Sequence, residues 1–284
     1  MKHAFMILAH KDLKQIEALI SGLAFGDIYI HVDKKNDQLF DQLKLYYQNH
    51  TNIFILEERT NVNWSGFSMV KATLTLIKYI VSANRYYDYI HLISGQDMIL
   101  MNHKQLDDFL LAKGESKIFI EYSDIGSYRW RVKRYSLFRE NPKNRTILLR
   151  ILDNLIRYVQ FIIPERNNLN QLQLYKGSQW FTISYECLIY INKTANKYIK
   201  DFYKTACADE HFFQILIMNS EYKNKVVNDN LRYIVFKNNK ASPEFISNQD
   251  FEKMMNGNYI FARKFESTVN QNIVDKIKIR LFKL

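Results

Sequence analysis

The segment Ala4-Phe5-Met6-Ile7-Leu8-Ala9, followed directly by His10, decides which fold class the sequence predicts. It is short, apolar throughout and ended by a polar residue, which is typical of a strand buried on both faces of a sheet. Further apolar runs of this kind alternate along the first half with stretches of helical periodicity. We predict strands at residues 4–9, 28–32, 53–56, 89–93 and 117–122, and helices at 13–23, 38–47, 68–81 and 103–111. This alternation predicts an α/β fold in which helices flank a mostly parallel central sheet.

Polar residues follow three of the predicted strands. His10 follows the first, Asp33 the second, and Ser94-Gly95-Gln96-Asp97 the strand that ends at Ile93. Each position alone could be an ordinary turn. Because ligands of parallel sheets bind beyond the carboxyl ends of the strands, the three positions together predict one binding cleft.

The composition fits one domain with a basic surface. The chain has 284 residues, of which 47% are hydrophobic, and only three prolines and eight glycines, with no linker-like tract. We therefore expect a single domain, 1–284. The net charge is +11 and the pI is about 9.4. This excess suggests an anionic partner: nucleotide phosphates, a membrane surface or nucleic acid.

Several classes are disfavoured by missing motifs. No G-x-G-x-x-G follows the first strand and no Walker lysine motif occurs, which argues against a dinucleotide dehydrogenase or a P-loop enzyme. Cys187 and Cys207 have neither metal-ligand spacing nor a disulfide framework. Since the first strand begins at once and no apolar run is long enough to span a bilayer, we expect a cytoplasmic protein.

The second half is less regular. Residues 122–139 are rich in Tyr, Trp and Arg, a composition suited to stacking and to anion binding. Residues 145–163 predict an amphipathic helix, which could pack on the core, contact an anionic membrane or form a dimer interface. We also predict strands at 180–183 and 231–236, a helix at 185–194, and a short strand before a C-terminal helix. In that strand Arg263 and Lys264 should point to opposite sides, so that only one faces the cleft.

Asp209 and Glu210 precede the apolar run Phe212-Phe213-Gln214-Ile215-Leu216. They should lie in the first turn of a buried helix, where the helix dipole favours ionised carboxylates. Helix capping is one interpretation of this pair and a proton acceptor is the other.

The order of several motifs resembles glycosyltransferase family 14, the core-2/I-branching β-1,6-N-acetylglucosaminyltransferases and the peptide O-xylosyltransferases. The matching segments are Ile30-His31-Val32-Asp33-Lys34, Trp64-Ser65-Gly66-Phe67-Ser68, Leu92-Ile93-Ser94-Gly95-Gln96-Asp97, Gly177-Ser178-Gln179-Trp180-Phe181, Asp209-Glu210-His211-Phe212-Phe213, Asn230-Leu231-Arg232, Ser242-Pro243, Gln249-Asp250-Phe251 and Phe261-Ala262-Arg263-Lys264-Phe265-Glu266-Ser267. They cover nearly the whole chain.

The resemblance implies a GT-A type fold and an inverting transferase that uses a UDP-sugar without a divalent metal or other cofactor. It implies a nucleotide-sugar-binding half, 1–122, and an acceptor and catalytic half, 123–284. The sequence contains no Asp-x-Asp, the usual metal clamp of nucleotide-sugar enzymes. Lys264 is the implied cation for the diphosphate, with Arg263 or Lys240 beside it.

The implied general base is Glu210, with Asp209 pointing elsewhere. The residues implied to bind the donor are His10, Val32, Asp33, Trp64, Ser65, Ser94, Asp97, Arg263 and Lys264. The residues implied to face the acceptor are Glu121, Arg131, Lys133, Gln179 and Trp180. No metal ligand is expected.

Departures from the family pattern guide the substrate prediction. Gln179 stands where the xylosyltransferases have an acid, so we expect GlcNAc as the donor sugar, with xylose or another hexose as alternatives. The cysteines, anchor and stem of the secreted animal enzymes are missing, which suggests a bacterial member. Its acceptor is then a surface glycan, either free or lipid-linked, and no nucleic acid is expected. The alternative is a basic α/β protein that binds nucleic acid or glycan without turnover.

Overall fold

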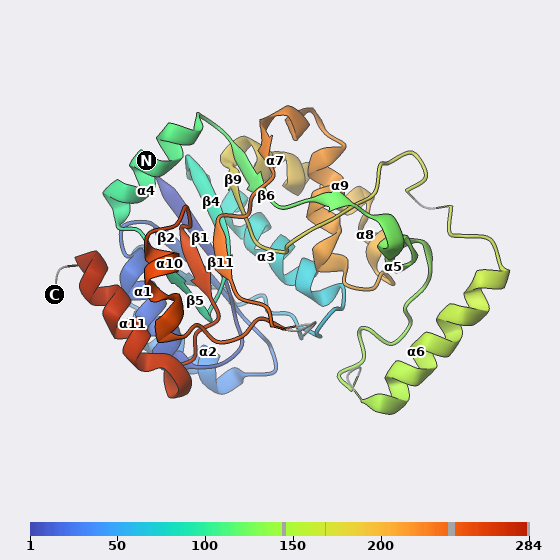
Figure 1. Cartoon of the computed structure of the whole chain (residues 1–284), viewed down its shortest axis with the longest axis horizontal. Helices are drawn as coiled ribbons and strands as arrows, with labels where there is room; N and C mark the ends of the chain where they lie inside the picture. The colour runs from blue at the N-terminus through green and yellow to red at the C-terminus, as the bar shows by residue number, and fades with distance from the viewer. Residues whose placement is uncertain (144–145, 168, 238–241, 283–284) are drawn as a thin grey trace.

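A mostly parallel sheet forms the centre of the molecule in the computed structural model, which describes residues 1–143, 146–167, 169–237 and 242–282 (Figure 1). Within these residues the sheet has seven strands, in the spatial order β10 (Val226–Val227), β6 (Ile118–Ile120), β9 (Phe181–Ser184), β4 (Tyr89–Ser94), β1 (His3–Ala9), β2 (Asp27–Val32) and β3 (Ile53–Ile55). Strand β1 runs parallel to both β2 and β4, and only β9 runs antiparallel to its neighbours. The predicted α/β class is confirmed.

Side chains of β1 alternate between two apolar cores, one on each face of the sheet. Phe5 and Ile7 belong to one core, and Ala4 and Met6 belong to the other, as expected for the two-residue repeat of a strand. The first core is covered by α1 (Leu13–Leu23), α2 (Asp37–Tyr47), α4 (His103–Lys113), α10 (Phe251–Met255) and α11 (Ser267–Phe282). The second is covered by α3 (Ser68–Ser82), α7 (Tyr185–Thr194), α8 (Ile199–Phe202) and α9 (Phe212–Met218).

Two small sheets bring distant parts of the chain to the carboxyl end of the large sheet. In the first, β12 (Phe261–Arg263) lies between β11 (Arg232–Ile234) and β5 (Asp97–Ile99), so that Arg263 is opposite Asp97. In the second, β7 (Ser123–Asp124) pairs with β8 (Tyr175–Lys176). Strand β9 of the predicted acceptor half also pairs with β4 of the predicted donor half. The two halves are therefore interleaved.

Most predicted elements are present with ends that shift by one to three residues. The helices predicted at 13–23 and 185–194 have these bounds in the structure. Strands β6 and β11 are shorter than predicted, because their outer residues lack a pairing strand. One short helix, α5 (Arg129–Lys133), was not predicted within the aromatic and basic region.

The expectation that Asp209 and Glu210 occupy the first turn of an α-helix is wrong. They lie in a 3₁₀ turn, Ala208–Glu210, and His211 breaks the helical path with φ of −131° before α9 begins at Phe212. The carboxylates are therefore placed by a separate turn. The helix that follows them, α9, has only seven residues and therefore only a weak dipole.

The predicted amphipathic helix forms α6 (Ile147–Val159), followed by a 3₁₀ turn, Gln160–Ile162. Arg145, the first residue of the predicted range, lies outside the described residues. Figure 1 shows α6 standing apart from the helices that cover the sheet. Most of its apolar side chains are exposed. Packing on the core, one of the three expectations for this helix, is therefore wrong. No helix within the described ranges is both long and apolar enough to cross a membrane.

Candidate active site

A cavity of about 750 Å³ opens at the carboxyl ends of β1, β2 and β4. His10, Asp33 and Ser94, the polar residues that follow these strands, all line it. They meet because parallel strands present their carboxyl ends at the same edge of the sheet. The prediction of one shared cleft is confirmed, and its volume is in the range of small-molecule sites.

Most of the site residues implied by the resemblance line this cavity. They are His10, Asp33, Trp64, Ser65, Ser94, Glu121, Gln179, Trp180, Glu210, Arg263 and Lys264. Lys240, suggested as a second cation, lies outside the described residues. The cavity thus combines carboxylates, cations and aromatic rings from both halves of the chain.

Two implied residues are buried away from the cavity. Val32 is the last residue of β2 and packs fully within the first core. Lys133 is also buried, and its Nζ donates hydrogen bonds to the carbonyl of Arg166 and to Oδ1 of Asn170. Since this ammonium is satisfied inside the protein, Lys133 is not placed to face an acceptor.

Asp97 also lies outside the cavity lining, but it contacts Arg263, which lines the cavity. Its Oδ2 accepts a hydrogen bond of 2.9 Å from the backbone N–H of Ser94, and its Oδ1 lies 3.6 Å from Nε of Arg263. Burial raises the pKa of the Asp97 carboxyl, and the charge of Arg263 opposes that shift. The guanidinium of Arg263 in turn lies 4.2 Å from the centre of the Trp180 ring. Asp97 and Trp180 therefore fix the position of this cation.

Both Arg263 and Lys264 line the cavity, so the expectation that only one of them faces the cleft is wrong. Strand β12 ends at Arg263, and strict alternation of side chains does not extend to the next residue. Nζ of Lys264 lies 4.9 Å from the centre of the Phe245 ring. The cavity wall therefore presents two adjacent cationic side chains.

Glu210 is held by an ion pair and by its backbone. Its Oε2 accepts a hydrogen bond of 2.5 Å from Nη1 of Arg131, which lies on α5 outside the cavity lining. Its carbonyl accepts a hydrogen bond of 2.9 Å from the N–H of Gly177. Among the described residues no hydrogen bond to Oε1 is present, and the side chain is 43% exposed. One carboxylate oxygen is thus fixed by Arg131, the other has no hydrogen bond from a described residue, and the residue lines the cavity.

Gly177 permits a close approach of two chain segments behind Glu210. A Cβ at this position would lie 1.8 Å from the carbonyl oxygen of Glu121, well inside van der Waals contact. Only glycine allows the backbone to pass here and donate to Glu210. Gly177, the first residue of the matched Gly177–Phe181 segment, therefore helps to position the Glu210 carboxylate.

Asp209 is among the residues that line the cavity beside Glu210. Its Oδ1 is buried and has no hydrogen-bond partner among the described residues. Burial and, next, the charge of Glu210 raise the pKa of Asp209 to about 7. This is the opposite of the ionised form that a helix N-terminus would favour. The 3₁₀ turn supplies too little of a dipole to offset desolvation.

The model of the Core-2/I-Branching enzyme family matches residues 3–255. The chain belongs to the Core-2/I-Branching enzyme family. The resemblance that the motifs indicated is therefore confirmed.

The chain is similar to curated xylosyltransferases over almost its whole length. Xylosyltransferase 2 of Rattus norvegicus is 24% identical over 304 residues, which cover 98% of this chain and 33% of that protein. Xylosyltransferase 1 of Rattus norvegicus is 23% identical, with 98% and 35% covered. This family member thus spans about a third of the length of the curated relatives it matches.

Solved structures show more distant likenesses. The inositol-1-phosphate CTP transferase from T. maritima is 10% identical with a TM-score of 0.41, over 98% of this chain and 97% of that one. The mannosyltransferase Ktr4p from S. cerevisiae is 10% identical with a TM-score of 0.33, over 73% and 66%.

Lys176 and Cys207 also line the cavity, although neither was among the site residues implied by the resemblance. Lys176 directly precedes the matched Gly177–Phe181 segment, which could have signalled it. Its Nζ lies 4.5 Å from the centre of the Tyr128 ring. Cys207 offers no sequence signal, and burial raises the pKa of its thiol to about 12, which disfavours the thiolate form.

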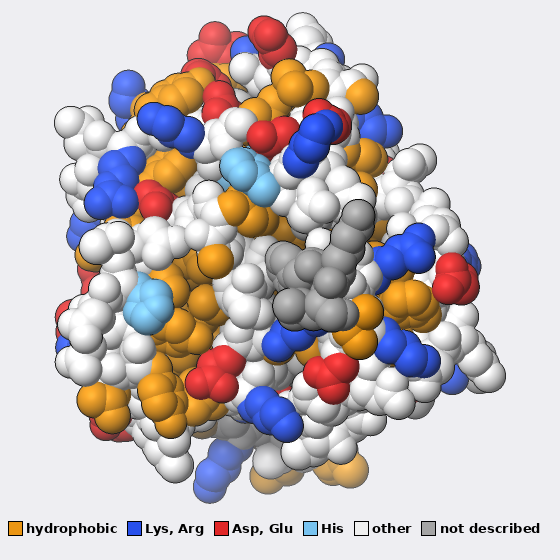
Figure 2. Space-filling view, turned by 90° about the vertical axis from the view of Figure 1, so that its left-hand side faces the viewer, with side chains coloured by type: hydrophobic (Ala, Val, Ile, Leu, Met, Phe, Trp, Pro, Cys, Tyr) orange, Lys and Arg blue, Asp and Glu red, His pale blue; other side chains and the backbone are white. Residues whose placement is uncertain are grey.

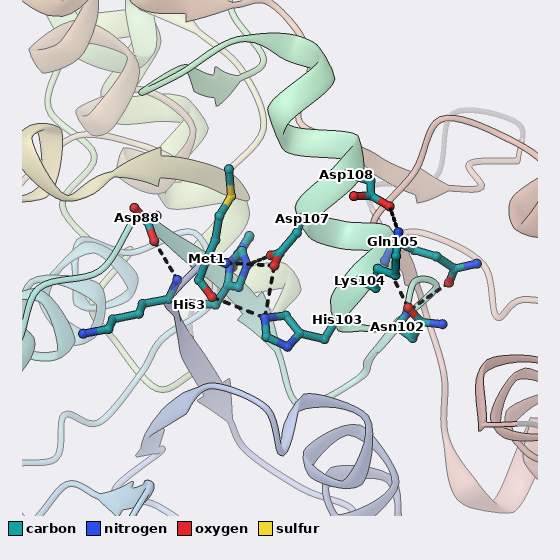
Figure 3. A network of polar contacts seen from close by, with 11 residues as sticks. Met1, His3, Asp88, Asn102, His103, Lys104, Gln105, Asp107 and Asp108 are labelled. Carbon is teal, nitrogen blue, oxygen red and sulfur yellow. Dashed lines mark hydrogen bonds and ion pairs between the residues drawn. The ribbon is translucent and has the colours of Figure 1, made fainter.

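One group of potential metal ligands exists among the described residues, and it lies far from the cavity. His3, His103 and Asp107 place their ligand atoms within 4.8 Å of one another (Figure 3). Asp107 already pairs with the N-terminal ammonium and with His3, both at 2.8 Å. His3 begins β1 and His10 follows its end, so about 20 Å of strand separates this group from the cavity.

Proposed function

We propose that this family member is an inverting glycosyltransferase that moves a sugar from a UDP-sugar to a saccharide hydroxyl without a divalent metal. One observation carries the proposal: a carboxylate with one open oxygen, Glu210, shares a cavity with two adjacent cations, Arg263 and Lys264. This arrangement provides a proton acceptor and a site for a diphosphate leaving group.

In the proposed reaction, Glu210 takes the proton from the acceptor hydroxyl as that oxygen attacks the anomeric carbon. The new C–O bond forms on the face opposite to the bond that breaks. The electron pair of the broken bond leaves with UDP, and the charge that develops on the diphosphate is stabilised by Arg263 and Lys264. A single displacement of this kind inverts the anomeric configuration.

The cations of the cavity are the basis for proposing a metal-free mechanism. A fixed cation can neutralise the leaving group as a metal would. Arg263 is suited to this task because Asp97 and Trp180 hold it in one position.

The remaining assignments follow from the family. Donor contacts are proposed at the strand ends with His10 and Asp33, and acceptor contacts at Glu121, Gln179 and Trp180. GlcNAc is the proposed donor sugar, since Gln179 replaces an acid of the xylosyltransferase pattern. The proposed acceptor is a saccharide or a lipid-linked glycan.

A panel of UDP-sugars, measured for binding and slow hydrolysis with and without EDTA, tests this function. We expect one UDP-sugar, UDP-GlcNAc, to bind and hydrolyse equally well in EDTA. Dependence on added Mg²⁺ or Mn²⁺ would overturn the metal-free mechanism. Binding of no UDP-sugar would reduce the family membership to fold alone, and salt-dependent RNA binding would then favour the nucleic-acid alternative.

A further inference from the structure

Residues 147–163, which comprise α6 and the 3₁₀ turn with Ile163, concentrate the exposed apolar surface of the described chain. Ten of the 23 exposed large hydrophobic side chains lie here, and exposure reaches 84% at Ile162. The ten are Ile147, Leu148, Ile151, Leu152, Leu155, Tyr158, Val159, Phe161, Ile162 and Ile163. An apolar stripe of this size usually faces a core, whereas this one faces solvent.

Two polar side chains hold this segment against the protein: Asp153 on α6 and Gln160 in the turn that follows. Asp153 is buried, and its Oδ2 lies 3.1 Å from Nη2 of Arg139. Gln160 accepts a hydrogen bond of 2.6 Å from the N–H of Tyr135 and donates one of 2.9 Å to its carbonyl. These contacts fix the rotation of the helix about its axis. The apolar side is therefore held outward by specific polar bonds.

The surroundings of this face are basic. From Arg129 to Arg166 the sequence has ten Lys or Arg residues and three acidic residues. All three acids are engaged: Asp153 with Arg139, Glu165 with Arg129, and Glu140 with the backbone N–H of Ser68. Arg131 is also in an ion pair and Lys133 and Arg134 are buried, so the exposed cations outside ion pairs in the described part of this stretch are Lys143 and Arg150. Arg150 on α6 is exposed and makes no ion pair with a described residue. By contrast, both signs of charge are spread over the side of the molecule away from α6 (Figure 2).

We propose that residues 147–163 dock the protein on an anionic lipid membrane. Apolar side chains would enter the boundary between headgroups and acyl chains, and the basic side chains beside them would pair with lipid phosphates. A helix of 13 residues is about 20 Å long, which suits a position in the plane of the interface and is too short to cross the bilayer.

A second copy of the chain fits this face less well. In a symmetric dimer the same patch meets itself, so the basic residues of the two copies would approach one another. An anionic membrane satisfies the apolar face and the positive charge together. The charge balance around α6 therefore favours lipid as the occupant.

The docking surface lies close to the cavity along the chain. Pro142 lines the cavity, and five positions later α6 begins at Ile147, so at most about 18 Å of chain separates them. A lipid-linked acceptor in the docked membrane would thus come near the cavity mouth. This consequence rests on the proposed function, whereas the docking itself does not.

Sedimentation of the purified chain with lipid vesicles tests the proposal. We expect binding to vesicles of phosphatidylcholine with phosphatidylglycerol and much weaker binding to phosphatidylcholine alone. The double variant Ile151→Glu/Leu155→Glu should lose about tenfold or more of the partition coefficient, because two exposed apolar anchors are replaced by charges. Arg150→Glu should lower binding about fivefold at low salt and less at high salt.

Ile279→Glu is the matched control, because Ile279 on α11 and Leu155 on α6 are both 55% exposed. This variant should bind vesicles like the wild type. Equal binding to both vesicle types, or unchanged binding by the double variant, would overturn the proposal. Light scattering offers a further test. A wild-type dimer that does not bind vesicles, and that the double substitution dissociates, would also overturn the proposal. UDP-sugar binding by the double variant should stay unchanged, which separates this test from that of the proposed function.

Discussion

Arg131 donates a hydrogen bond of 2.5 Å to Oε2 of Glu210 and also lies 4.4 Å from the centre of the Tyr128 ring. The cation is therefore braced by an aromatic ring while it holds one oxygen of the carboxylate. Arg131 does not line the cavity itself. It acts on the proposed reaction by orienting Glu210.

Glu210→Gln should lower turnover about a hundredfold or more while the affinity for UDP stays within a few-fold of the wild type. The amide keeps the shape of the side chain but cannot accept the acceptor proton. Turnover assays and UDP titration calorimetry measure the two effects. Glu221→Gln, on an exposed residue outside the cavity lining, serves as the control and should change neither. Near wild-type turnover by Glu210→Gln would exclude it as the base.

Arg131→Met should lower kcat by roughly tenfold or more with little change in KM for the donor, because the base loses its orientation and not its chemistry. Arg131→Lys should recover part of the loss, since an ammonium can still pair with the carboxylate but lacks the planar fork. A loss confined to KM would show that Arg131 binds substrate directly. Circular dichroism of both variants checks that the overall fold is kept.

Lys264→Ala should weaken UDP binding by roughly tenfold or more, as expected when a cation is removed from a charged diphosphate. Isothermal titration calorimetry measures this directly. Lys104→Ala removes an 85% exposed lysine on α4 and should leave the affinity unchanged. If Lys264→Ala bound UDP as tightly as the wild type, the diphosphate would lie elsewhere.

Asp209 should make stability fall as pH rises from about 4 to about 7. Its folded-state pKa of about 7 lies above the ordinary value of 3.8, so in this window the folded state holds a proton that the unfolded state has lost. The free energy of unfolding then decreases by on the order of 1 kcal/mol per pH unit from this group. Asp209→Asn should remove that slope and be more stable than the wild type at pH 8. Urea unfolding at several pH values measures it.

Asp275→Asn, on the exposed surface of α11, is the control for that experiment and should keep the wild-type slope. An Asp209→Asn variant with the same pH dependence as the wild type would mean that the carboxyl is ionised in the fold and well solvated.

Gly177→Ala should cost more than about 2 kcal/mol of stability and lower activity, because the new Cβ would collide with backbone and must displace the segment that holds Glu210. Gly126→Ala is a useful comparison. A Cβ at Gly126 would meet no atom within 4 Å. The substitution is therefore opposed only by the positive φ of 46°, which should cost about 1 kcal/mol of stability. Thermal unfolding compares the two. Equal costs would show that the close approach at Gly177 is unimportant.

The sequence alone determined the fold class, the position of the cleft and the family. Apolar runs such as residues 4–9 are local signals, and a parallel sheet gathers its strand ends without further information. The strand pattern by itself was therefore enough to bring His10, Asp33 and Ser94 to one cleft. The matched motifs also placed Glu210, Arg263 and Lys264 at that cleft.

Only the tertiary structure decided which way individual side chains face and how they are charged. Asp209 carries a raised pKa because distant segments bury it, and Lys133 turns inward because Asn170 and the Arg166 carbonyl satisfy it. The periodicity of α6 showed two faces but not which one meets the protein, since that depends on Arg139 and Tyr135. Periodicity and motif spacing are local properties, whereas burial and pairing arise from contacts between residues far apart in the chain.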